Sequence, residues 1–296
     1  MFAPLPESAI LKVEESVARD LLTAAKALPE YENREYYSTD LQMQVRDHFQ
    51  QGCGGFEELI GQIEQRLSKW PYCVLVQGLL FDEGNRVFVG VNRAFGELVA
   101  RPYEKPRAQL VHYIQPATDI PSPRGGHESE RLHTDTADWE PPIELISMVC
   151  MRADPDGGGR SRVLDVDSIR DEVNDNLGAT TLKRLETEAV PWQLASYCGG
   201  GVQWRTILSE SGICWRRYTI DAALDSTGTT LSSEMISALD AFEDVITRTP
   251  RTIDFLMREG ELLFSDNRRT IHARTPISSN GKASDRLMIR SWVRRG

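Results

Sequence analysis

The sequence predicts a mainly β fold with flanking helices, built on a two-sheet jelly roll, also called a double-stranded β-helix. Segments rich in β-branched and apolar residues recur along the chain, bounded by glycine, proline or charged turns. Their number is close to what a two-sheet jelly roll needs. No repeat or linker composition divides the 296 residues. We therefore expect one elaborated domain over residues 1–296 rather than two.

The N-terminal part, to about residue 70, is predicted to be helical. Apolar residues recur at helical spacing over Ser8–Leu28, where the serine can cap the first turn, and a second helix is expected over Phe56–Lys69. A β-branched run after a proline predicts a buried strand over Tyr72–Leu79. Another helix is expected over Val87–Val99.

Strand-like segments dominate from residue 107 onward. Arg258–Glu261 has the length and the glycine of a tight turn and is expected to join two strands as a hairpin. Helical patterns at Ser168–Val173, Thr180–Ala189 and Leu231–Thr247 predict a helical insertion between core strands, within about 167–250. The predicted strands are Ala108–Ile114, Ile143–Arg152, Ser161–Val166, Val202–Leu208, Cys214–Ile220, Ile253–Met257, Leu262–Ser265 and Leu287–Val293.

Composition and charge narrow the class of protein. Apolar residues make up 40% of the chain and charged residues 26%, which allows a sizeable core. The net charge of −10 argues against binding to a nucleic-acid backbone. The chain starts without the features of a signal peptide, and no apolar run is long enough to cross a bilayer. We expect a cytoplasmic protein with no nucleic-acid or membrane partner, and the oligomeric state stays open.

The five cysteines do not suggest a cysteine-based site. Their number is odd, they are widely spaced, and no CxxC pattern occurs. Such a set predicts buried free thiols rather than a disulfide framework or a thiolate zinc site.

Only one of the five histidines lies in an HxD pattern. In an extended segment, His133 and Asp135 would point to the same face. Two histidines and one carboxylate on one face of an octahedron leave three positions open, the arrangement found in non-haem Fe(II) oxygenases. His272, in a strand-like run far along the chain, is the candidate for the missing ligand. Since HxD occurs by chance in many proteins, the rest of the sequence must decide whether this copy binds a metal.

Two arginines near the C-terminus supply that context. Arg286 and Arg290 are four residues apart in a predicted buried strand and therefore share a face. An inward-facing guanidinium offers a planar fork that matches a carboxylate, which suits a dicarboxylate ligand. The alternative is a pair of surface ion pairs, one between Arg286 and Asp285 and one between Arg290 and a glutamate.

Four motifs occur along the chain: Leu132–Asp135 with Pro141–Pro142 downstream, Gly158–Ser161, Asp266–Pro276 and Asp285–Arg286. Together they resemble the taurine dioxygenase and clavaminate synthase superfamily of Fe(II)- and 2-oxoglutarate-dependent oxygenases. The motifs occur in the order that this superfamily has, and the resemblance covers roughly residues 70 to 296.

The resemblance implies the roles of the site residues. Iron would be held by His133, Asp135 and His272, which form the catalytic centre. Arg286, fourteen positions after His272, would bind the 5-carboxylate of 2-oxoglutarate. Ser161 stands where relatives usually have a threonine that donates a second hydrogen bond to this carboxylate. The same serine could instead simply begin a strand after a glycine turn.

The resemblance also implies contacts to the substrate. Arg290 corresponds to a second arginine that faces either the cosubstrate or an anionic substrate group. Asp138 and Trp139 would lie where the substrate enters, with the indole excluding water, although core packing explains Trp139 equally well. Retention of Asp135 disfavours chlorination, because halogenating relatives replace this carboxylate with a small residue.

Three further segments have open interpretations. The stretch Gly125–Arg131, with one histidine and two glutamates, is expected to be a lid or surface loop rather than a second metal site. Cys198–Trp204 and Trp215–Tyr218 combine aromatic and basic residues or glycines. They could line a pocket for an anionic or amino-acid-like substrate, or form a sheet surface with arginines extended to solvent.

The activity that the resemblance implies couples oxidation of a small molecule to conversion of 2-oxoglutarate and O2 into succinate and CO2. The preferred expectation is hydroxylation of an unactivated C–H bond in an amino acid, an amino-acid derivative or another specialised metabolite of a biosynthetic pathway. Desaturation, cyclisation or epoxidation would use the same cofactors. A non-catalytic jelly-roll binding protein and a zinc hydrolase with the same three ligands are the other two classes.

Overall fold

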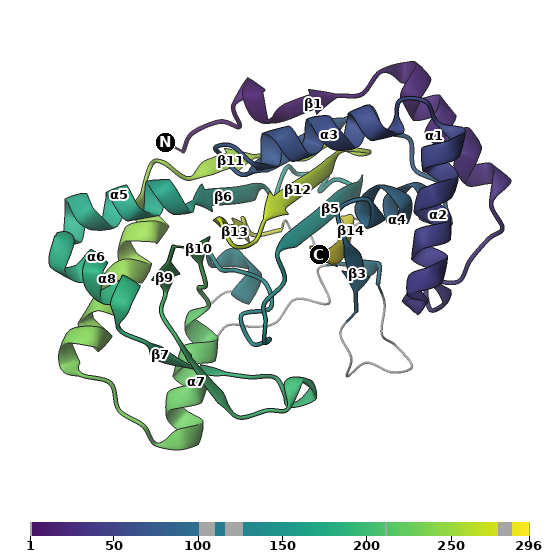
Figure 1. The fold of residues 1–296 in the computed structure, drawn as a ribbon. Coiled ribbons are helices and arrows are strands. Elements are labelled where there is room, and N and C mark those ends of the chain that lie inside the picture. Colours follow the sequence, from purple (N-terminus) through teal and green to yellow (C-terminus); the bar gives the residue numbers. More distant parts are fainter. Residues whose placement is uncertain (1, 101–109, 116–126, 211, 278–285, 296) are drawn as a thin grey trace.

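The computed structural model describes residues 2–100, 110–115, 127–210, 212–277 and 286–295. These parts of the chain form eight α-helices, one seven-stranded sheet, one three-stranded sheet and two two-stranded ribbons (Figure 1). None of the helices in these ranges has the length and apolar character needed to span a lipid bilayer.

The seven-stranded sheet is the largest element of the fold. Its longest strands, β5 and β14, have eight residues each and pair antiparallel at its centre. The sheet is mixed, because its edge strand β1 runs parallel to β2 while the other pairs are antiparallel. In order across the sheet, the strands are β1 (Ile10–Lys12), β2 (Cys73–Gln77), β12 (Leu262–Asp266), β5 (Leu145–Arg152), β14 (Leu287–Arg294) and β3 (Glu97–Val99), with β4 (His112–Ile114) also on β14.

The three-stranded sheet consists of β11 (Ile253–Phe255), β6 (Ser161–Asp165) and β13 (Thr270–Arg274). A buried apolar cluster joins it to the large sheet, with Leu75 and Met288 from the large sheet and Val163 from the small one among its members. The two sheets therefore share a core. Side chains that point between them at the open end of this core can reach a common centre.

Four helices cover the outer face of the large sheet (Figure 1). Phe49 and Ile63 of these helices pack in one cluster with Val76, Phe264 and Ile289 of the sheet, and all five are buried. Strands with apolar residues on both faces, such as β2, are explained by this double cover. The helices are α1 (Glu15–Ala27), α2 (Thr39–Gly52), α3 (Phe56–Leu67) and α4 (Arg86–Arg93).

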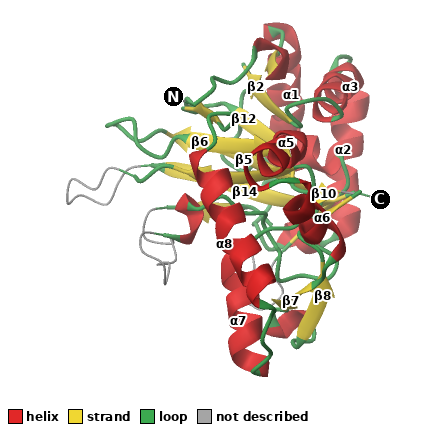
Figure 2. Ribbon diagram, turned by 90° about the vertical axis from the view of Figure 1, so that its left-hand side faces the viewer, coloured by secondary structure: helices red, strands yellow, loops and turns green. Residues whose placement is uncertain are grey.

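A helical insertion separates β6 from β11 and has its own core, in which Trp192, Trp215 and Phe242 are fully buried. Figures 1 and 2 show α7 and the β7–β8 ribbon together below the two sheets. The insertion consists of α5 (Val166–Leu177), α6 (Ala179–Thr187), the ribbons β7 (Val190–Gln193) with β8 (Val202–Arg205) and β9 (Leu208–Ser209) with β10 (Gly212–Ile213), α7 (Arg217–Thr227) and α8 (Ser233–Arg248).

Two of the helices expected near the N-terminus are shorter than predicted. The helix expected over Ser8–Leu28 begins only at Glu15, because Ile10–Lys12 instead pairs in parallel with β2. The helix expected over Val87–Val99 ends at Arg93, and Glu97–Val99 is strand β3. In both cases the residues outside the helix form an edge strand of the large sheet. The spacing of apolar residues alone does not reveal this strand pairing.

Two strand predictions in the second half are wrong. Cys214–Ile220 is not a strand, because helix α7 starts at Arg217. Arg258–Glu261 is a turn but not a hairpin, since β11 pairs with β6 in the small sheet and β12 pairs with β2 and β5 in the large one. The turn therefore carries the chain from one sheet to the other.

The remaining predicted elements have counterparts in the structure. The buried strand after Pro71, the helix from Phe56 and the insertion helices α5, α6 and α8 lie within a few residues of their expected bounds. Of the strand expected over Ala108–Ile114, residues 108–109 lie outside the described part, and His112–Ile114 forms β4. Helix α2 and strand β7 had no sequence prediction.

Candidate metal centre

The two histidines of the site are neighbours across an antiparallel bridge. The backbone N–H of His133 donates to the carbonyl of His272 at 3.0 Å, and the reverse bond measures 2.9 Å. Directly opposed residues of such a bridge project their side chains to the same side. The centroids of the two imidazole rings are accordingly 4.6 Å apart. Strand β13 fixes one ring, and the bridge fixes the other against it.

A buried asparagine holds the carboxylate ligand in place. The backbone N–H of Asp135 donates to Oδ1 of Asn267 at 2.8 Å, and Nδ2 of Asn267 donates to the carbonyls of Asp135 at 2.9 Å and Ile143 at 2.8 Å. The chain then turns through Thr136, whose φ of 54° is left-handed. Asn267 thus ties the turn after β12 to the ligand segment, and both ligand-bearing segments keep one relative position.

Three ligand atoms converge as predicted from the HxD pattern and the distant histidine. Oδ1 of Asp135 lies 3.5 Å from Nε2 of His133 and 3.7 Å from Nε2 of His272. One ligand atom from each of the three residues lies within 4.8 Å of the others. The Nδ1 atom of His133 lies 2.7 Å from the carbonyl of Arg131, so its Nε2 lone pair is left to face the centre.

The charge states of these groups suit a cation. Burial lowers the pKa of His133 to about 4, so its imidazole is neutral at pH 7 and forms no ion pair with Asp135. Burial alone would raise the pKa of Asp135, but the Arg290 guanidinium holds it well below its usual range. A neutral imidazole and an ionised carboxylate face one point, which is the donor chemistry that a divalent iron site requires.

Arg290 lies on the metal side of the site. Its Nη1 donates to Oδ2 of Asp135 at 2.9 Å, and Nε1 of Trp292 donates to the same oxygen at 2.8 Å. The guanidinium also lies over the Trp292 ring, 4.5 Å from its centroid. Sequence reasoning placed Arg290 against the cosubstrate or the substrate. In the structure it lines the cavity but contacts the metal carboxylate, leaving Oδ1 toward the centre.

An inner cavity of about 190 Å³ adjoins the triad. Arg286, Arg274 and Ser161 line it together with His133, Asp135 and His272. Arg286 is only 5% exposed, and burial lowers its pKa. Burial and the charge of Arg286 lower the pKa of Arg274 to about 10. One buried and one partly buried guanidinium group beside one cavity favour a dianionic ligand.

The Gly158–Ser161 segment forms the seat of Arg286. Nη2 of Arg286 donates to the carbonyl of Gly159 at 3.3 Å. Gly159 has a φ of +64°, and a Cβ atom there would lie 2.5 Å from Nε of Arg286. The residue must therefore be glycine on two counts, conformation and space. Ser161 is both the first residue of β6 and a wall of the cavity, so its two sequence interpretations are compatible.

A larger outer cavity of about 630 Å³ lies between the triad and the helical insertion. Its walls come from the segment Glu128–His133, from Trp215 to Asp225 at the start of and along α7, and from Glu243 of α8. Glu128, His133 and Arg216 line both cavities, so the outer one opens beside the metal ligands. This volume lies within the range of pockets that bind small molecules.

A family model agrees with this site. Residues 210–292 match the taurine catabolism dioxygenase TauD, TfdA family. The match covers less than a third of the chain and is a likeness to that family. The matched segment includes His272, Arg286 and Arg290, whereas His133 and Asp135 precede it. No curated protein sequence matches the chain.

Solved structures of three oxygenases share its fold. An asparagine oxygenase in complex with Fe(II), 2S,3S-3-hydroxyasparagine and succinate has a TM-score of 0.74 at 17% identity, over 96% of this chain and 93% of that one. The non-heme iron oxygenase OrfP in complex with Fe and alpha-ketoglutaric acid has a TM-score of 0.69 at 17% identity, over 96% and 93%. A taurine dioxygenase from Burkholderia xenovorans has a TM-score of 0.57 at 16% identity, over 81% and 82%.

Asp138 and Trp139 were expected where the substrate enters, with core packing as the alternative for Trp139. Trp139 is 4% exposed, stacks edge-on against Trp292 with centroids 5.6 Å apart, and donates from Nε1 to the hydroxyl of Tyr197 at 2.6 Å. Trp139 is therefore a core residue. Neither Trp139 nor Asp138 lines the inner or the outer cavity. Of the two aromatic segments considered for a pocket, Trp215–Tyr218 lines the outer cavity, and Cys198–Trp204 lines neither.

Four residues at the candidate site had no assigned role before the structure. Asn267 and Trp292 lay inside quoted segments, but their bonds to the Asp135 segment join positions more than 130 apart in sequence. Arg274 follows His272 by two positions in a strand, and this spacing could have placed it on the same face. Glu128 was expected on a lid or surface loop, yet it is 8% exposed within the 3-10 helix Glu128–Glu130.

Proposed function

We propose that the protein is an Fe(II)- and 2-oxoglutarate-dependent dioxygenase that hydroxylates an unactivated C–H bond of an amino acid, an amino-acid derivative or a similar small metabolite. The observation that carries this proposal is the position of two arginines, the buried Arg286 and the partly buried Arg274, on the cavity that adjoins the triad. The match of residues 210–292 to the taurine catabolism dioxygenase TauD, TfdA family supports the dioxygenase class. The products besides the oxidised substrate would be succinate and CO2.

The residues fit both cofactors. Two imidazole nitrogens and one carboxylate oxygen form a mixed donor set on one side of a point, which suits Fe(II) and leaves positions for further ligands. Bound iron and 2-oxoglutarate would together supply the oxidant that removes a substrate hydrogen. Arg286 would bind the distal carboxylate with a hydrogen bond from Ser161, and Arg274 would add a second positive charge.

Other residues would hold this arrangement and exclude water. Arg290 and Trp292 fix one oxygen of Asp135, so the other keeps its direction toward the iron. The outer cavity would admit the substrate to the open side of the site. A zinc hydrolase or a non-catalytic binding protein would need the triad at most, and neither explains two arginines on the adjoining cavity.

The amino-acid substrate class is supported by the names of two similar structures. One is an asparagine oxygenase with hydroxyasparagine, and the other is OrfP with (3S)-hydroxy-L-Arg. Desaturation, cyclisation and epoxidation remain alternative outcomes of the same chemistry, since the position of the substrate decides among them. We also propose that the two facing sheets form a jelly-roll core within a single domain that includes the helical insertion.

The test uses spectroscopy and product analysis. Anaerobic addition of Fe(II) and 2-oxoglutarate should produce the visible absorption band of a chelated α-keto acid, and substrate should trigger succinate release with O2 uptake. Arg286→Ala should raise the KM for 2-oxoglutarate by about 10- to 100-fold or more, because a buried charged hydrogen-bond donor is lost. Absence of the band, with metal content unchanged in His133→Ala, would contradict the assignment. Turnover with Zn(II) and no keto acid would favour a hydrolase.

A further inference from the structure

Glu128 carries a buried carboxylate that no described residue engages. The side chain lines both the inner and the outer cavity, and the residue is 8% exposed. Neither a hydrogen bond nor an ion pair joins its carboxylate to any residue in the described ranges, whereas neighbouring acids are paired: Glu130 with His127 and Arg274, and Glu243 with Arg131. A buried charge without a partner opposes folding, so a retained one indicates a ligand of opposite charge.

Arg216 stands at the same junction with the opposite charge. It precedes α7, lines both cavities, and lies close enough to His133 to act on its imidazole electrostatically. Its guanidinium has no ion-pair partner among the residues that the structure describes, including Glu128. The next residue, Arg217, is by contrast paired with Asp221 at 2.8 Å and Asp240 at 2.7 Å.

We infer that the substrate is a zwitterion whose ammonium group binds Glu128 and whose carboxylate binds Arg216. This assignment rests on the proposed function and names the groups that would orient the substrate beside the triad. Two opposite charges on one cavity that do not neutralise each other are complementary to a molecule that carries both charges. The rest of the substrate would extend into the outer cavity, along Trp215 and the first turns of α7.

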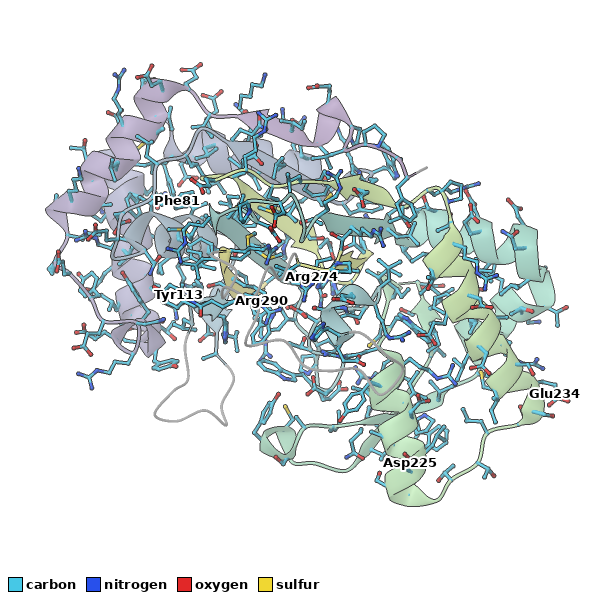
Figure 3. The ribbon with its side chains drawn as sticks, turned by 180° about the vertical axis from the view of Figure 1, so that it is seen from behind. Phe81, Tyr113, Asp225, Glu234, Arg274 and Arg290 are labelled. Carbon is cyan, nitrogen blue, oxygen red and sulfur yellow. The ribbon has the colours of Figure 1, made fainter. Side chains whose placement is uncertain are left out.

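The outer cavity also indicates the size of the substrate. At about 630 Å³ it lies in the middle of the range for drug-sized ligands rather than at its lower limit. Its far wall includes Asp225, which is exposed on α7 two turns beyond Arg216 (Figure 3). The space fits an amino acid with a long or derivatised side chain, or a dipeptide, better than a small free amino acid.

The experiment measures binding by calorimetry to the anaerobic enzyme loaded with Fe(II) and 2-oxoglutarate. The probes are free L-amino acids and L-dipeptides, each with its N-acetyl and its C-terminal amide derivative. We expect at least one zwitterion to bind saturably and both of its derivatives to bind at least about 10-fold more weakly, because each derivative leaves either Glu128 or Arg216 without its partner charge in the cavity.

Two variants assign each charge to its residue. Glu128→Gln should weaken binding of the zwitterion by about 10- to 100-fold. It should leave the affinity for the N-acetyl derivative, which is already weak, unchanged. Arg216→Gln should do the same for the zwitterion and leave the amide unchanged. Glu234→Gln, an exposed site on α8, removes one negative charge far from the cavities and should bind like wild type (Figure 3).

A second readout separates a ligand-binding role from a structural one. Because Glu128 is buried without a partner among the described residues, Glu128→Gln should raise the melting temperature of the metal-free protein, whereas removal of a structural carboxylate would lower it. The inference is overturned if no zwitterion binds, if the N-acetyl compound binds as tightly as its parent, or if Glu128→Gln leaves the affinity unchanged. Loss of the keto-acid absorption band would instead refute the proposed function, and calorimetry with the metal-free protein would still test Glu128.

Discussion

At the scale of single residues, the metal ligands depend on groups that do not touch the centre. His133 is oriented by a carbonyl of its own segment, and Asp135 by Arg290, Trp292 and Asn267. Such supporting contacts fix the direction of the lone pairs before a metal binds. Atom Nδ1 of His272 is buried without a hydrogen-bond partner in the described part of the chain. Strand β13 itself must therefore determine the position of the His272 ring.

Gly159 offers a test of the arginine seat that leaves the triad intact. In Gly159→Ala, the new methyl group would meet the Arg286 guanidinium, so the arginine must move. We expect the KM for 2-oxoglutarate to rise by about 10-fold or more while the affinity for Fe(II) stays unchanged, since a buried charged contact is lost. Steady-state kinetics and metal titration measure the two quantities.

The control for this variant is Gly157→Ala. Gly157 also has a left-handed φ, of +75°, but a Cβ atom there would meet nothing within 4 Å. Both variants carry similar backbone strain, and only Gly159→Ala displaces Arg286. An equal rise in KM for the two variants would show that loop strain, rather than the position of Arg286, is responsible.

At the scale of elements, the packing of α4 on α2 can be tested without touching the site. Gly90 of α4 faces Phe49 of α2, and a Cβ atom at this position would lie 2.1 Å from the ring. Gly90→Ala should lower the free energy of unfolding by about 1–3 kcal/mol, because the overpacked ring must shift. Denaturant unfolding measures this change, and the affinity for Fe(II) should not change.

Gly61→Ala is the matched control within the same helical layer. Gly61 lies in α3, is exposed, and has no atom within 4 Å of the position of a new Cβ. Alanine should stabilise this helix by about 0.5–1 kcal/mol, because glycine costs more backbone entropy. If both glycine variants stabilised the protein, the close approach of α4 to Phe49 would be disproved.

Elements with a strong local pattern could be predicted from the sequence, and those defined by a distant partner could not. Helix α3 and the insertion helix α8 have amphipathic spacing, and strand β2 has a continuous apolar run. By contrast, Ile10–Lys12 has the spacing of a helix and became a strand only because the edge of β2 was available. The turn at Arg258–Glu261 has hairpin chemistry, but the choice of sheet depends on residues elsewhere.

The candidate site follows the same rule. His133, Asp135 and His272 were recognisable because their types and spacing are tied to coordination chemistry. Glu128 was not recognisable as a site residue, because a single glutamate in a polar segment is expected to be solvated until its burial is known. Arg290 was recognised as an inward-facing arginine, but its contact with Asp135 is a matter of three-dimensional distance.

At the scale of the whole molecule, metal binding should stabilise the fold. The ligands come from the segment that contains His133 and from β13, and a metal bound by both binds only the folded state. Saturating Fe(II) at about 100 times its Kd should add about 2.7 kcal/mol to the free energy of unfolding. Anaerobic thermal unfolding, with and without a chelator, measures this effect.

The cosubstrate should act only through this metal-loaded state. 2-Oxoglutarate should raise the melting temperature further in the loaded wild type and much less in Arg286→Ala. In His272→Ala neither addition should have a large effect, because one of the ligands is missing. Equal stabilisation of metal-free and loaded protein by 2-oxoglutarate would contradict the shared inner cavity.

The strand order of the large sheet has a consequence for synthesis of the chain. Strand β2 is buried between β1 and β12, and the register pairs Val76 with Leu262, 186 positions later. At the rates of translation, roughly 10–40 s pass between the emergence of these two residues. During that time the apolar run Cys73–Val76 has an open edge, which is prone to pairing with other chains. The nascent protein is therefore expected to depend on chaperones until β12 leaves the ribosome.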